Sequence, residues 1–257
     1  MANIDINCDM GEAFGNYSMP NDEILFKYIS SANIACGFHA GDPTVMQDTV
    51  ALAIQNNVAI GAHPGLQDLQ GFGRREMKMT PKEVYQITLY QIGALSGFVK
   101  AASAKLHHVK PHGALYNMAA KDIKFAEAIV AAIYDFDPSL ILYGLAGSEL
   151  IHAAHYKSIK SASEVFADRT YQDDGSLTPR SQANALITNE KDTLVQVLMM
   201  VNRQQVISAN QKIISLNADT LCIHGDGAYA VEFAKIIHQT LTNEGIIIKH
   251  PQNDIKI

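Results

Sequence analysis

The chain has 257 residues, of which 47% are hydrophobic and 18% are charged, and these proportions are typical of a soluble globular protein. This length is enough for one large α/β domain with a sizeable core, so we expect a single domain over residues 1–257. The formal net charge of -6 disfavours a nucleic-acid partner. The chain opens on the polar stretch MANIDIN rather than on a signal peptide, and no apolar run is long enough to span a membrane. We therefore expect a cytoplasmic protein without a membrane partner.

Apolar runs of strand length alternate with helical patterns along the chain, without a break in composition. The predicted strands are Ile4–Cys8, Ala32–Cys36, Val58–Ala62, Leu106–Lys110, Pro138–Tyr143, Ser161–Phe166 and Thr220–Ile223. The predicted helices are Asp22–Ser31, Thr44–Gln55, Thr80–Ala102, Lys121–Tyr134, a short one after residue 149, Gln182–Ile187, Asp192–Gln204 and Tyr229–Asn243. The longest helix has clear start signals, because Thr80 is a good N-cap and Glu83 completes a capping box.

Seven strand–helix units of this kind predict a parallel sheet covered by helices. A barrel fits better than an open sheet, because polar loops follow nearly every strand, as they would around one rim. An open sheet concentrates its site at one switch point instead. The chain has neither GxGxxG after its first strand nor GxxxxGK[ST], so no nucleotide fingerprint supports the open sheet. The predicted fold class is therefore α/β, a seven-stranded β/α barrel.

The three cysteines lie far apart in the sequence and show no CxxC spacing. Cys8, Cys36 and Cys222 each lie within or at the end of an apolar run. We expect buried thiols rather than metal ligands or nucleophiles.

The stretch NIACGFHAGDP, residues 33–43, shows how each unit is built. An apolar strand runs into Gly37, which permits a sharp backbone turn, and His39 follows in the loop. Asp42 is a plausible N-cap of the next helix, with Pro43 in its first turn. Such an arrangement is typical of a site at the carboxyl end of a strand in an α/β protein.

Chemically active side chains follow most of the predicted strands. They are Asp9, Glu12, His39, Asp42, His63, Lys110, His112, Asp168, Arg169, His224 and Asp226. Four of the ten histidines lie within three residues of the carboxyl end of a predicted strand. A barrel would point these four into one cavity, so we expect a shared functional site there. The other histidines, including His107 and His108 in or beside a strand, are expected to be packing or surface residues.

Two of these groups also have simpler interpretations. Asp9 and Glu12 lie three residues apart around Gly11, and they could serve only in helix capping or turn formation. The polar loop 173–180 could be a solvated surface loop. Alternatively, it could place Arg180 near an anionic group, because guanidinium groups match carboxylates.

Two kinds of chemistry fit carboxylates and histidines at one rim. A carboxylate with two histidines is a common divalent-metal set, and a bound metal makes hydroxide available at neutral pH. Alternatively, Asp and His act directly as general base and acid on water, while Lys110 or Arg169 stabilises developing negative charge. The chain has no HExxH and no close HxH pair, so a divalent metal is possible but not required. Nothing resembles the GxSxG elbow of serine hydrolases.

Seven motifs resemble the LamB/YcsF family, over nearly the whole chain from Ile4 to about Asn243. They are INCDMGE, NIACGFHAGDP, GAHPGLQDLQGFGRR, HVKPHGALYN, GLAGSEL, FADRTYQDDGSLTPRSQ and CIHGD. One departure follows the last predicted strand, where family members often have HGDTPGA and this chain has HGDGAYA. The difference concerns the shape of that loop and leaves His224 and Asp226 in place.

The resemblance implies an irregular seven-stranded β/α barrel like that of glycoside hydrolases, polysaccharide deacetylases and related hydrolases. It also implies a function, because this family supplies the A subunit of the bacterial ATP-dependent 5-oxoprolinase. That enzyme converts 5-oxo-L-proline, ATP and water to L-glutamate, ADP and phosphate, and subunits B and C complete it. A lactam is a poor electrophile that phosphorylation of its oxygen would activate. Since this chain has no phosphate-binding loop, we expect the partners to carry the ATP-dependent step.

In that reaction this chain would direct water at the activated ring. The expected catalytic residues are Asp9, Glu12, His39, His63, Lys110 and His112. Asp9 or His39 would be the general base, and the others would orient the substrate or stabilise the tetrahedral intermediate. The expected substrate-binding residues are Asn7, Asp42, Asp168, Arg169, Arg180, His224 and Asp226. Arg169 or Arg180 would hold the substrate carboxylate.

Two other functions stay open from the sequence. A stand-alone, metal-dependent deacetylase or amidohydrolase would hold a stoichiometric divalent metal and work without ATP. A non-catalytic binding protein would present a pocket, and loss of His39 or His112 would not change the activity of its complex.

Overall fold

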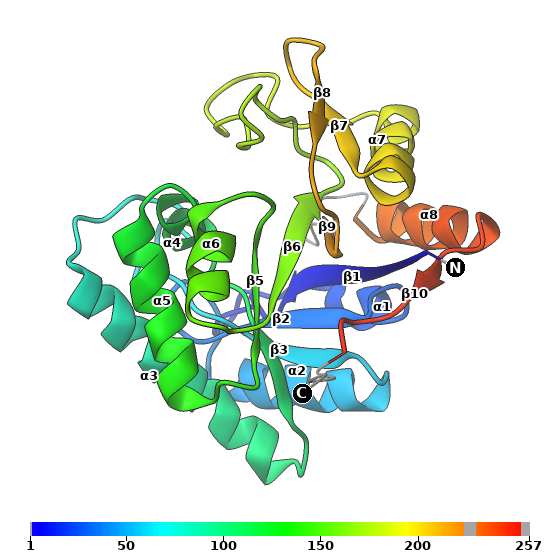
Figure 1. Cartoon of the computed structure of the whole chain (residues 1–257). Helices are drawn as coiled ribbons and strands as arrows, with labels where there is room; N and C mark the ends of the chain where they lie inside the picture. Colours follow the sequence, from blue (N-terminus) through cyan, green and yellow to red (C-terminus); the bar gives the residue numbers. More distant parts are fainter. Residues whose placement is uncertain (1, 224–229, 253–257) are drawn as a thin grey trace.

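The computed structural model of the chain describes residues 2–223 and 230–252, in which strands and helices alternate (Figure 1). The strands of the main sheet are β1 (Asn3–Met10), β2 (Ser31–Ala35), β3 (Ala59–His63), β4 (Leu106–Val109), β5 (Ile141–Leu145), β6 (Ser161–Phe166), β9 (Thr220–Ile223) and β10 (Ile247–Ile248). The helices are α1 (Asp22–Leu25), α2 (Pro43–Gln55), α3 (Pro81–Ala101), α4 (Gly113–Ala119), α5 (Ile123–Phe136), α6 (Glu149–Tyr156), α7 (Glu190–Arg203) and α8 (Ala230–Asn243). An antiparallel hairpin is formed by β7 (Gln205–Ile207) and β8 (Ile213–Ser215).

Seven parallel strands close into a barrel, which confirms the predicted fold class. Strands β1 to β6 pair in chain order, and β6 then pairs with β9. The barrel closes where β9 pairs with β1, with Thr220 opposite Asp5 and Cys222 opposite Asn7. The short strand β10 pairs with the beginning of β1. Because the seven strands are parallel, the side chains that follow them gather at one rim of the barrel.

Strand β1 separates an apolar layer from a polar barrel interior. Its even-numbered residues, from Ile4 to Met10, are fully buried in the hydrophobic core of the protein. Asp5, Asn7 and Asp9 alternate with them, and therefore face the other side of the sheet, the inside of the barrel. Asp5 accepts hydrogen bonds from hydroxyl groups of β2 and β9, at 2.8 and 2.6 Å. The barrel is thus held from within by hydrogen bonds between strands.

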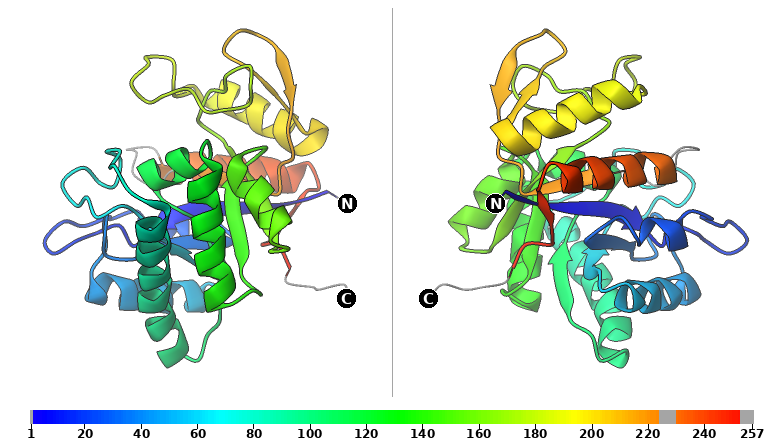
Figure 2. Two further views of the ribbon diagram at one scale, coloured as in Figure 1. Left: turned by 60° about the vertical axis from the view of Figure 1, so that its left-hand side comes forward. Right: turned by 90° about the vertical axis from the view of Figure 1, so that its right-hand side faces the viewer.

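The helices surround the barrel (Figure 2). Several of them begin at side-chain caps. Helix α3 packs against α5, and α5 packs against α6. The capping box predicted for α3 is present, since Thr80 and Glu83 each accept a hydrogen bond from the backbone N–H of the other. Asp42 caps α2 as predicted, by accepting hydrogen bonds from the N–H groups of Thr44 and Val45. Helix α7 packs against α8 and continues into β7 (Figure 1).

Some predicted elements differ from those of the structure. The predicted helix Asp22–Ser31 is shortened to α1, because Ser31 already begins β2 and its hydroxyl bonds to Asp5 inside the barrel. The segment Gln182–Ile187 forms turns rather than a helix. Its backbone is held by the residues after β6, since the N–H of Ile187 donates to the carbonyl of Asp168. Helix α4 and the β7–β8 hairpin were not predicted.

Two further expectations concern the core and the surface. Cys8, Cys36 and Cys222 are all buried, as predicted. Among residues 2–223 and 230–252, no helix combines the length and the apolar composition that a membrane crossing requires.

Candidate functional site

The predicted catalytic residues lie at the carboxyl ends of β1, β2, β3 and β4. They are Asp9 near the end of β1, Glu12 directly beyond it, His39 in the loop after β2, His63 as the last residue of β3, and Lys110 and His112 after β4. These four strands are neighbours in the parallel sheet, so the structure brings the six side chains together.

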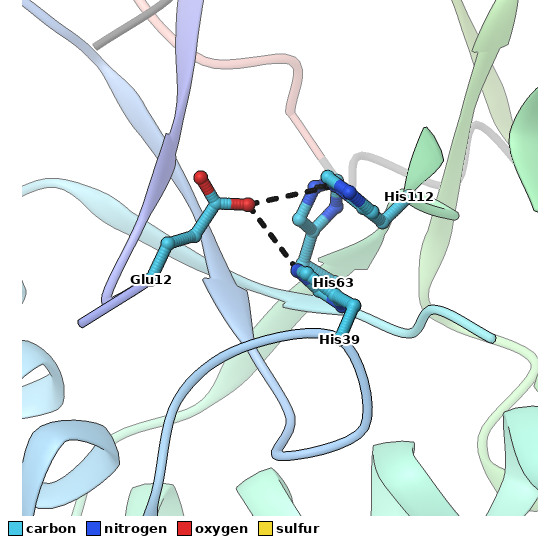
Figure 3. A group of neighbouring side chains, drawn as sticks. All are labelled: Glu12, His39, His63 and His112. Atoms are coloured by element: carbon cyan, nitrogen blue, oxygen red, sulfur yellow. Dashed lines mark hydrogen bonds and ion pairs between the residues drawn. The ribbon is translucent and has the colours of Figure 1, made fainter. Parts of the chain in front are cut away.

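Three histidines surround one carboxylate oxygen (Figure 3). Oε1 of Glu12 lies 3.2 Å from Nε2 of His39 and 3.5 Å from Nδ1 of His112. Nε2 of His63 lies 2.9 Å from Nδ1 of His112. One donor atom from each of these four residues lies within 4.8 Å of the other three, so the group could hold a metal ion. We call Glu12, His39, His63 and His112 the Glu–His cluster.

Backbone groups fix the orientation of two of the three rings. His63 donates a hydrogen bond from Nδ1 to the carbonyl of Lys110 at 2.7 Å. His112 donates from Nε2 to the carbonyl of Phe72 at 2.8 Å. Nδ1 of His39 has no hydrogen-bond partner in the described residues, and it lies against Gly65. A Cβ on Gly65 would stand 2.4 Å from this nitrogen, so the close contact requires glycine.

Burial and neighbouring charges set the protonation of the site. Burial, followed by the charges of His112 and His63, lowers the pKa of His39 well below its ordinary value. Burial and then His63 lower the pKa of His112 to about 3. Burial alone would raise the pKa of Asp9, but His63 and Lys110 hold it well below its usual range. At neutral pH the site therefore combines the neutral imidazoles of His39 and His112 with an ionised Asp9.

Lys110 carries a buried positive charge beside the cluster. Its Nζ lies 2.9 Å from Oδ1 of Asp9 and 2.8 Å from Oε1 of Glu164. It also donates to Oδ1 of Asn7 at 3.1 Å. Burial would lower the pKa of Lys110, but Asp9, Cys222 and Glu164 raise it well above its ordinary value. The ammonium group is therefore charged and held between two carboxylates.

A cavity of about 800 Å³ opens at this rim, which is the size of a typical small-molecule site. The members of the predicted catalytic set that line it are Asp9, Glu12, His63, Lys110 and His112. His39 is 1% exposed and lies behind them. The other charged groups of the lining are Arg74, Glu76, Lys121, Arg169, Asp174 and Arg180. The cavity therefore presents charges of both signs to a small polar molecule.

The predicted substrate-binding residues occupy three kinds of position. Arg169 and Arg180 line the cavity. Arg169 also supports a loop, because its guanidinium donates to the backbone carbonyls of Ala185 and Thr178. Asn7 is buried inside the barrel below the cavity, where it bonds to Lys110, Asn33 and Thr220. Asp42 caps α2, and Asp168 lies beside Arg169 in the loop after β6. His224 and Asp226 lie outside the described residues.

Sequence reasoning missed several polar residues of the site. Glu164 is fully buried on β6 and accepts a hydrogen bond of 2.6 Å from Tyr116, which lines the cavity. A carboxylate inside the apolar run SASEVF was the available signal. Asn33 donates to Asp9 at 2.9 Å and is bonded at its own oxygen by His108, at 2.8 Å. His108 was expected only to pack, and it does stack on Tyr143, with ring centroids 4.1 Å apart.

These features define a class of protein: a parallel β/α barrel with a carboxylate, histidine and lysine site at the carboxyl rim, where barrel enzymes have their active sites. The chain belongs to the LamB/YcsF family, which it matches over residues 4–256.

Relatives of almost equal length are closely similar in sequence. The chain is 60% identical over 249 residues to the 5-oxoprolinase A subunit of Geobacillus thermodenitrificans (strain NG80-2), with 97% of each chain covered. It is 58% identical over 254 residues to the protein of the same name from Geobacillus kaustophilus (strain HTA426), with 99% of each covered.

Solved structures agree with this assignment. The crystal structure of the lactam utilization protein from Thermus thermophilus has a TM-score of 0.91 and 42% sequence identity, and covers 97% of this chain and 100% of that one. A family 4 carbohydrate esterase from Streptomyces lividans, in complex with acetate, has a TM-score of 0.52 at 9% identity, covering 99% of this chain and 95% of that one. This second similarity shows the shared deacetylase-type barrel fold alone.

Proposed function

We propose that this chain is the A subunit of a cytoplasmic, ATP-dependent 5-oxoprolinase, and that it hydrolyses the lactam C–N bond of 5-oxo-L-proline to give L-glutamate. Relatives that are up to 60% identical over 97% of both chains carry the name of this subunit. The structural observation that carries the proposal is the ionised Asp9, paired with the Lys110 ammonium at the wall of a cavity of small-molecule size. Such a pair can orient water and stabilise negative charge in the same place.

The ATP-dependent step is assigned to the partner subunits B and C. The sequence of this chain has no GxxxxGK[ST] phosphate-binding loop. Transfer of a phosphoryl group to the lactam oxygen would weaken the amide resonance and make the ring carbon a better electrophile. The present chain would then receive the activated ring and add water to its carbon. The C–N bond of this adduct breaks, with a proton taken up by the nitrogen, and a second water releases phosphate from the resulting acyl phosphate to give L-glutamate. In this division of labour, the hydrolytic site and the ATP requirement belong to different subunits.

Within the site, the cavity favours Asp9 over His39 as general base. Asp9 lines the cavity and is ionised, whereas His39 is buried behind the lining. A carboxylate whose pKa is lowered is a weak base, but a phosphorylated lactam needs only a well-oriented water. Lys110 lies 2.9 Å from Asp9 and lines the same cavity, so its charge would stabilise the oxyanion of the tetrahedral intermediate.

Arg180 is the better placed of the two candidate anchors for the substrate carboxylate. Both arginines line the cavity, but Arg169 is buried, whereas Arg180 is exposed and accessible to an incoming molecule. Arg180 lies on the exposed side of the cavity wall, where a planar guanidinium can pair with an incoming carboxylate.

The test is complementation of a lysate that lacks this chain but retains its partners. Conversion of labelled 5-oxoproline to glutamate is followed with and without ATP, after addition of wild-type, Asp9→Asn or His152→Gln protein. His152 is a matched control, because its side chain is 59% exposed on α6. We expect wild type and His152→Gln to restore activity only with ATP, and Asp9→Asn to restore less than about 1% of it.

The remaining outcomes separate the alternatives. Full rescue by Asp9→Asn would keep the subunit assignment and refute the role of Asp9 as base. A chain that restores nothing, but releases acetate from N-acetylated sugars without ATP, would support the deacetylase alternative. The Glu–His cluster is the observation that favours this second candidate.

A further inference from the structure

Two histidine nitrogens face each other in the Glu–His cluster, with Nε2 of His63 2.9 Å from Nδ1 of His112. A carbonyl oxygen can only accept, so the bonds to the carbonyls of Lys110 and Phe72 place a ring proton on Nδ1 of His63 and on Nε2 of His112. An imidazole that carries only this one proton has an acceptor at its other nitrogen. The contact between the two facing nitrogens therefore needs either a further proton or a cation between them.

Carboxylate oxygens surround the same point. Oε1 of Glu12 lies 3.5 Å from Nδ1 of His112, and Oδ2 of Asp9 lies 3.2 Å from Nε2 of His63. Lys110 is bonded to the other oxygen of Asp9. Two acceptor nitrogens 2.9 Å apart in a buried site repel each other unless a cation or a shared proton lies between them, and the nearby carboxylates favour such a cation.

The geometry points to a divalent-metal site formed by Glu12 Oε1, His63 Nε2 and His112 Nδ1. In a tetrahedral site with metal–nitrogen bonds of 2.0–2.1 Å, neighbouring ligand atoms are about 3.4 Å apart. The separations of 2.9 and 3.5 Å from Nδ1 of His112 to Nε2 of His63 and Oε1 of Glu12 lie near that value. The ring of His39 is stacked on that of His112, with centroids 3.8 Å apart, so a metal in the plane of His112 lies outside the plane of His39, and His39 packs behind the ligands. Two imidazoles and one carboxylate, with a fourth position left for water or substrate, form a donor set that suits Zn²⁺, and Co²⁺ binds in the same geometry.

The backbone carbonyls supply the second requirement of a metal site. Ligating histidines almost always donate their other ring N–H to a fixed acceptor, which sets the tautomer and the ring orientation. His63 and His112 meet this condition. His39 does not, because its Nδ1 lies against Gly65 without a partner in the described residues. We therefore assign His63 and His112, and not His39, as the imidazole ligands.

The site is placed where a metal would matter for catalysis. Glu12, His63 and His112 all line the cavity that is proposed to receive the lactam. When bound, a divalent ion would act as a Lewis acid toward a carbonyl or phosphoryl oxygen in that cavity. The metal site itself rests on the cluster geometry and not on the identity of the substrate.

The test measures metal binding on the purified full chain after removal of metal with a chelator. Titration calorimetry with Zn²⁺ and with Co²⁺ is expected to give one site per chain. Co²⁺ is also expected to give the visible absorption bands of a four-coordinate complex. We expect a loss of affinity of at least about 100-fold for His63→Gln and His112→Gln, and a much smaller loss for His39→Gln, which only packs against His112.

Two controls keep the test decisive. His152→Gln removes an exposed histidine far from the cluster in the fold and is expected to bind metal like wild type. Circular dichroism shows whether each variant is folded. A rise in the melting temperature of wild-type protein with added Zn²⁺ gives a second readout that needs no variant.

Each outcome decides the proposal. Binding of neither ion by wild type, or equal binding by wild type and His63→Gln, would overturn the metal site. Nitrogen-15 spectra of the histidine side chains would then show a proton shared between His63 and His112. A chain that binds Zn²⁺ but fails to complement the 5-oxoprolinase lysate would retain the metal site and refute the proposed function. A chain that complements the lysate but binds neither metal would support the proposed function and refute the metal site.

Discussion

Replacement of Lys110 by methionine is expected to destabilise the protein strongly. Nζ of Lys110 lies 2.8 Å from Glu164 and 2.9 Å from Asp9, and the side chains of Lys110 and Glu164 are 3% and 0% exposed. Methionine nearly preserves the volume but leaves Glu164 without the ammonium group and leaves Asp9 with His63 as its remaining ion-pair partner in the described residues. Removing one partner of a buried ion pair costs about 3–5 kcal/mol, so the free energy of unfolding should fall by about 4 kcal/mol. For a chain of this size, that corresponds to a melting temperature lower by about 8–16 °C.

The assay is urea and thermal unfolding of the isolated chain, with Lys212→Met as the matched control. Nζ of Lys212 lies 2.7 Å from Asp173, but these side chains are 66% and 31% exposed. Exposed ion pairs contribute little to stability, so this variant should unfold almost like wild type. Equal, small effects of the two substitutions would refute the interpretation of Lys110 as the charge that stabilises the barrel interior.

The same comparison has a defined pH dependence. Burial would lower the pKa of Lys110, but the neighbouring Asp9, Cys222 and Glu164 raise it well above its ordinary value. The stability that this group contributes is therefore fully present below its unfolded pKa of about 10.4, and is lost as the pH rises through the raised folded value. The difference between wild type and Lys110→Met should stay constant from pH 7 to pH 9. A difference that decreases across this range would contradict the assignment.

Three further outcomes follow from single contacts. Burial lowers the pKa of His107 from 6.5 to about 4. Between pH 4 and pH 6.5 the unfolded chain therefore binds a proton at His107 that the folded chain does not bind, so the free energy of unfolding rises with pH over this range. Urea unfolding at pH 4.5 and 7 should show a smaller rise for His107→Gln, and an unchanged rise would exclude His107 as a cause. Asp42→Ala removes the cap of α2 and should lower the melting temperature by a few degrees without changing KM. A raised KM in a variant as stable as wild type would instead support substrate binding by Asp42. Gly65→Ala would place a Cβ 2.4 Å from Nδ1 of His39 and so displace this ring. If the variant folds, turnover in the complemented lysate should fall by about 100-fold. Normal turnover would show that the position of the His39 ring is unimportant for the reaction.

The barrel and the cluster of polar side chains at its rim were predictable because their signals are local. Each strand is a short apolar run, and each run is followed by glycine or proline and a charged or imidazole side chain, as in NIACGFHAGDP. Parallel pairing then placed Asp9, His39, His63 and His112 together without further information. Helix α4 was missed because it begins directly after His112, in a segment whose proline and glycine are typical of the loop after a strand.

The polar interior could not be predicted, because its partners are distant in the sequence. The alternation of Asp5, Asn7 and Asp9 with apolar residues was visible, but it does not say what the polar side faces. In most such strands the polar side faces solvent. Here the sheet closes on itself, and these side chains bond to others such as Thr220, more than two hundred positions away.

Closure of the barrel by its last strand has a consequence for synthesis on the ribosome. The hydrogen bond between Asn7 and Thr220 joins residues 213 positions apart, and β9 is the strand that pairs with the open edge of β1. At about 5–20 residues per second, roughly 10–40 s pass between synthesis of the two strands. During this interval the nascent chain carries an unpaired strand edge, which is a template for association with other chains. The yield of folded protein is therefore expected to depend on chaperone protection of β1 until residue 220 emerges. C-terminal truncations that remove β9 should aggregate.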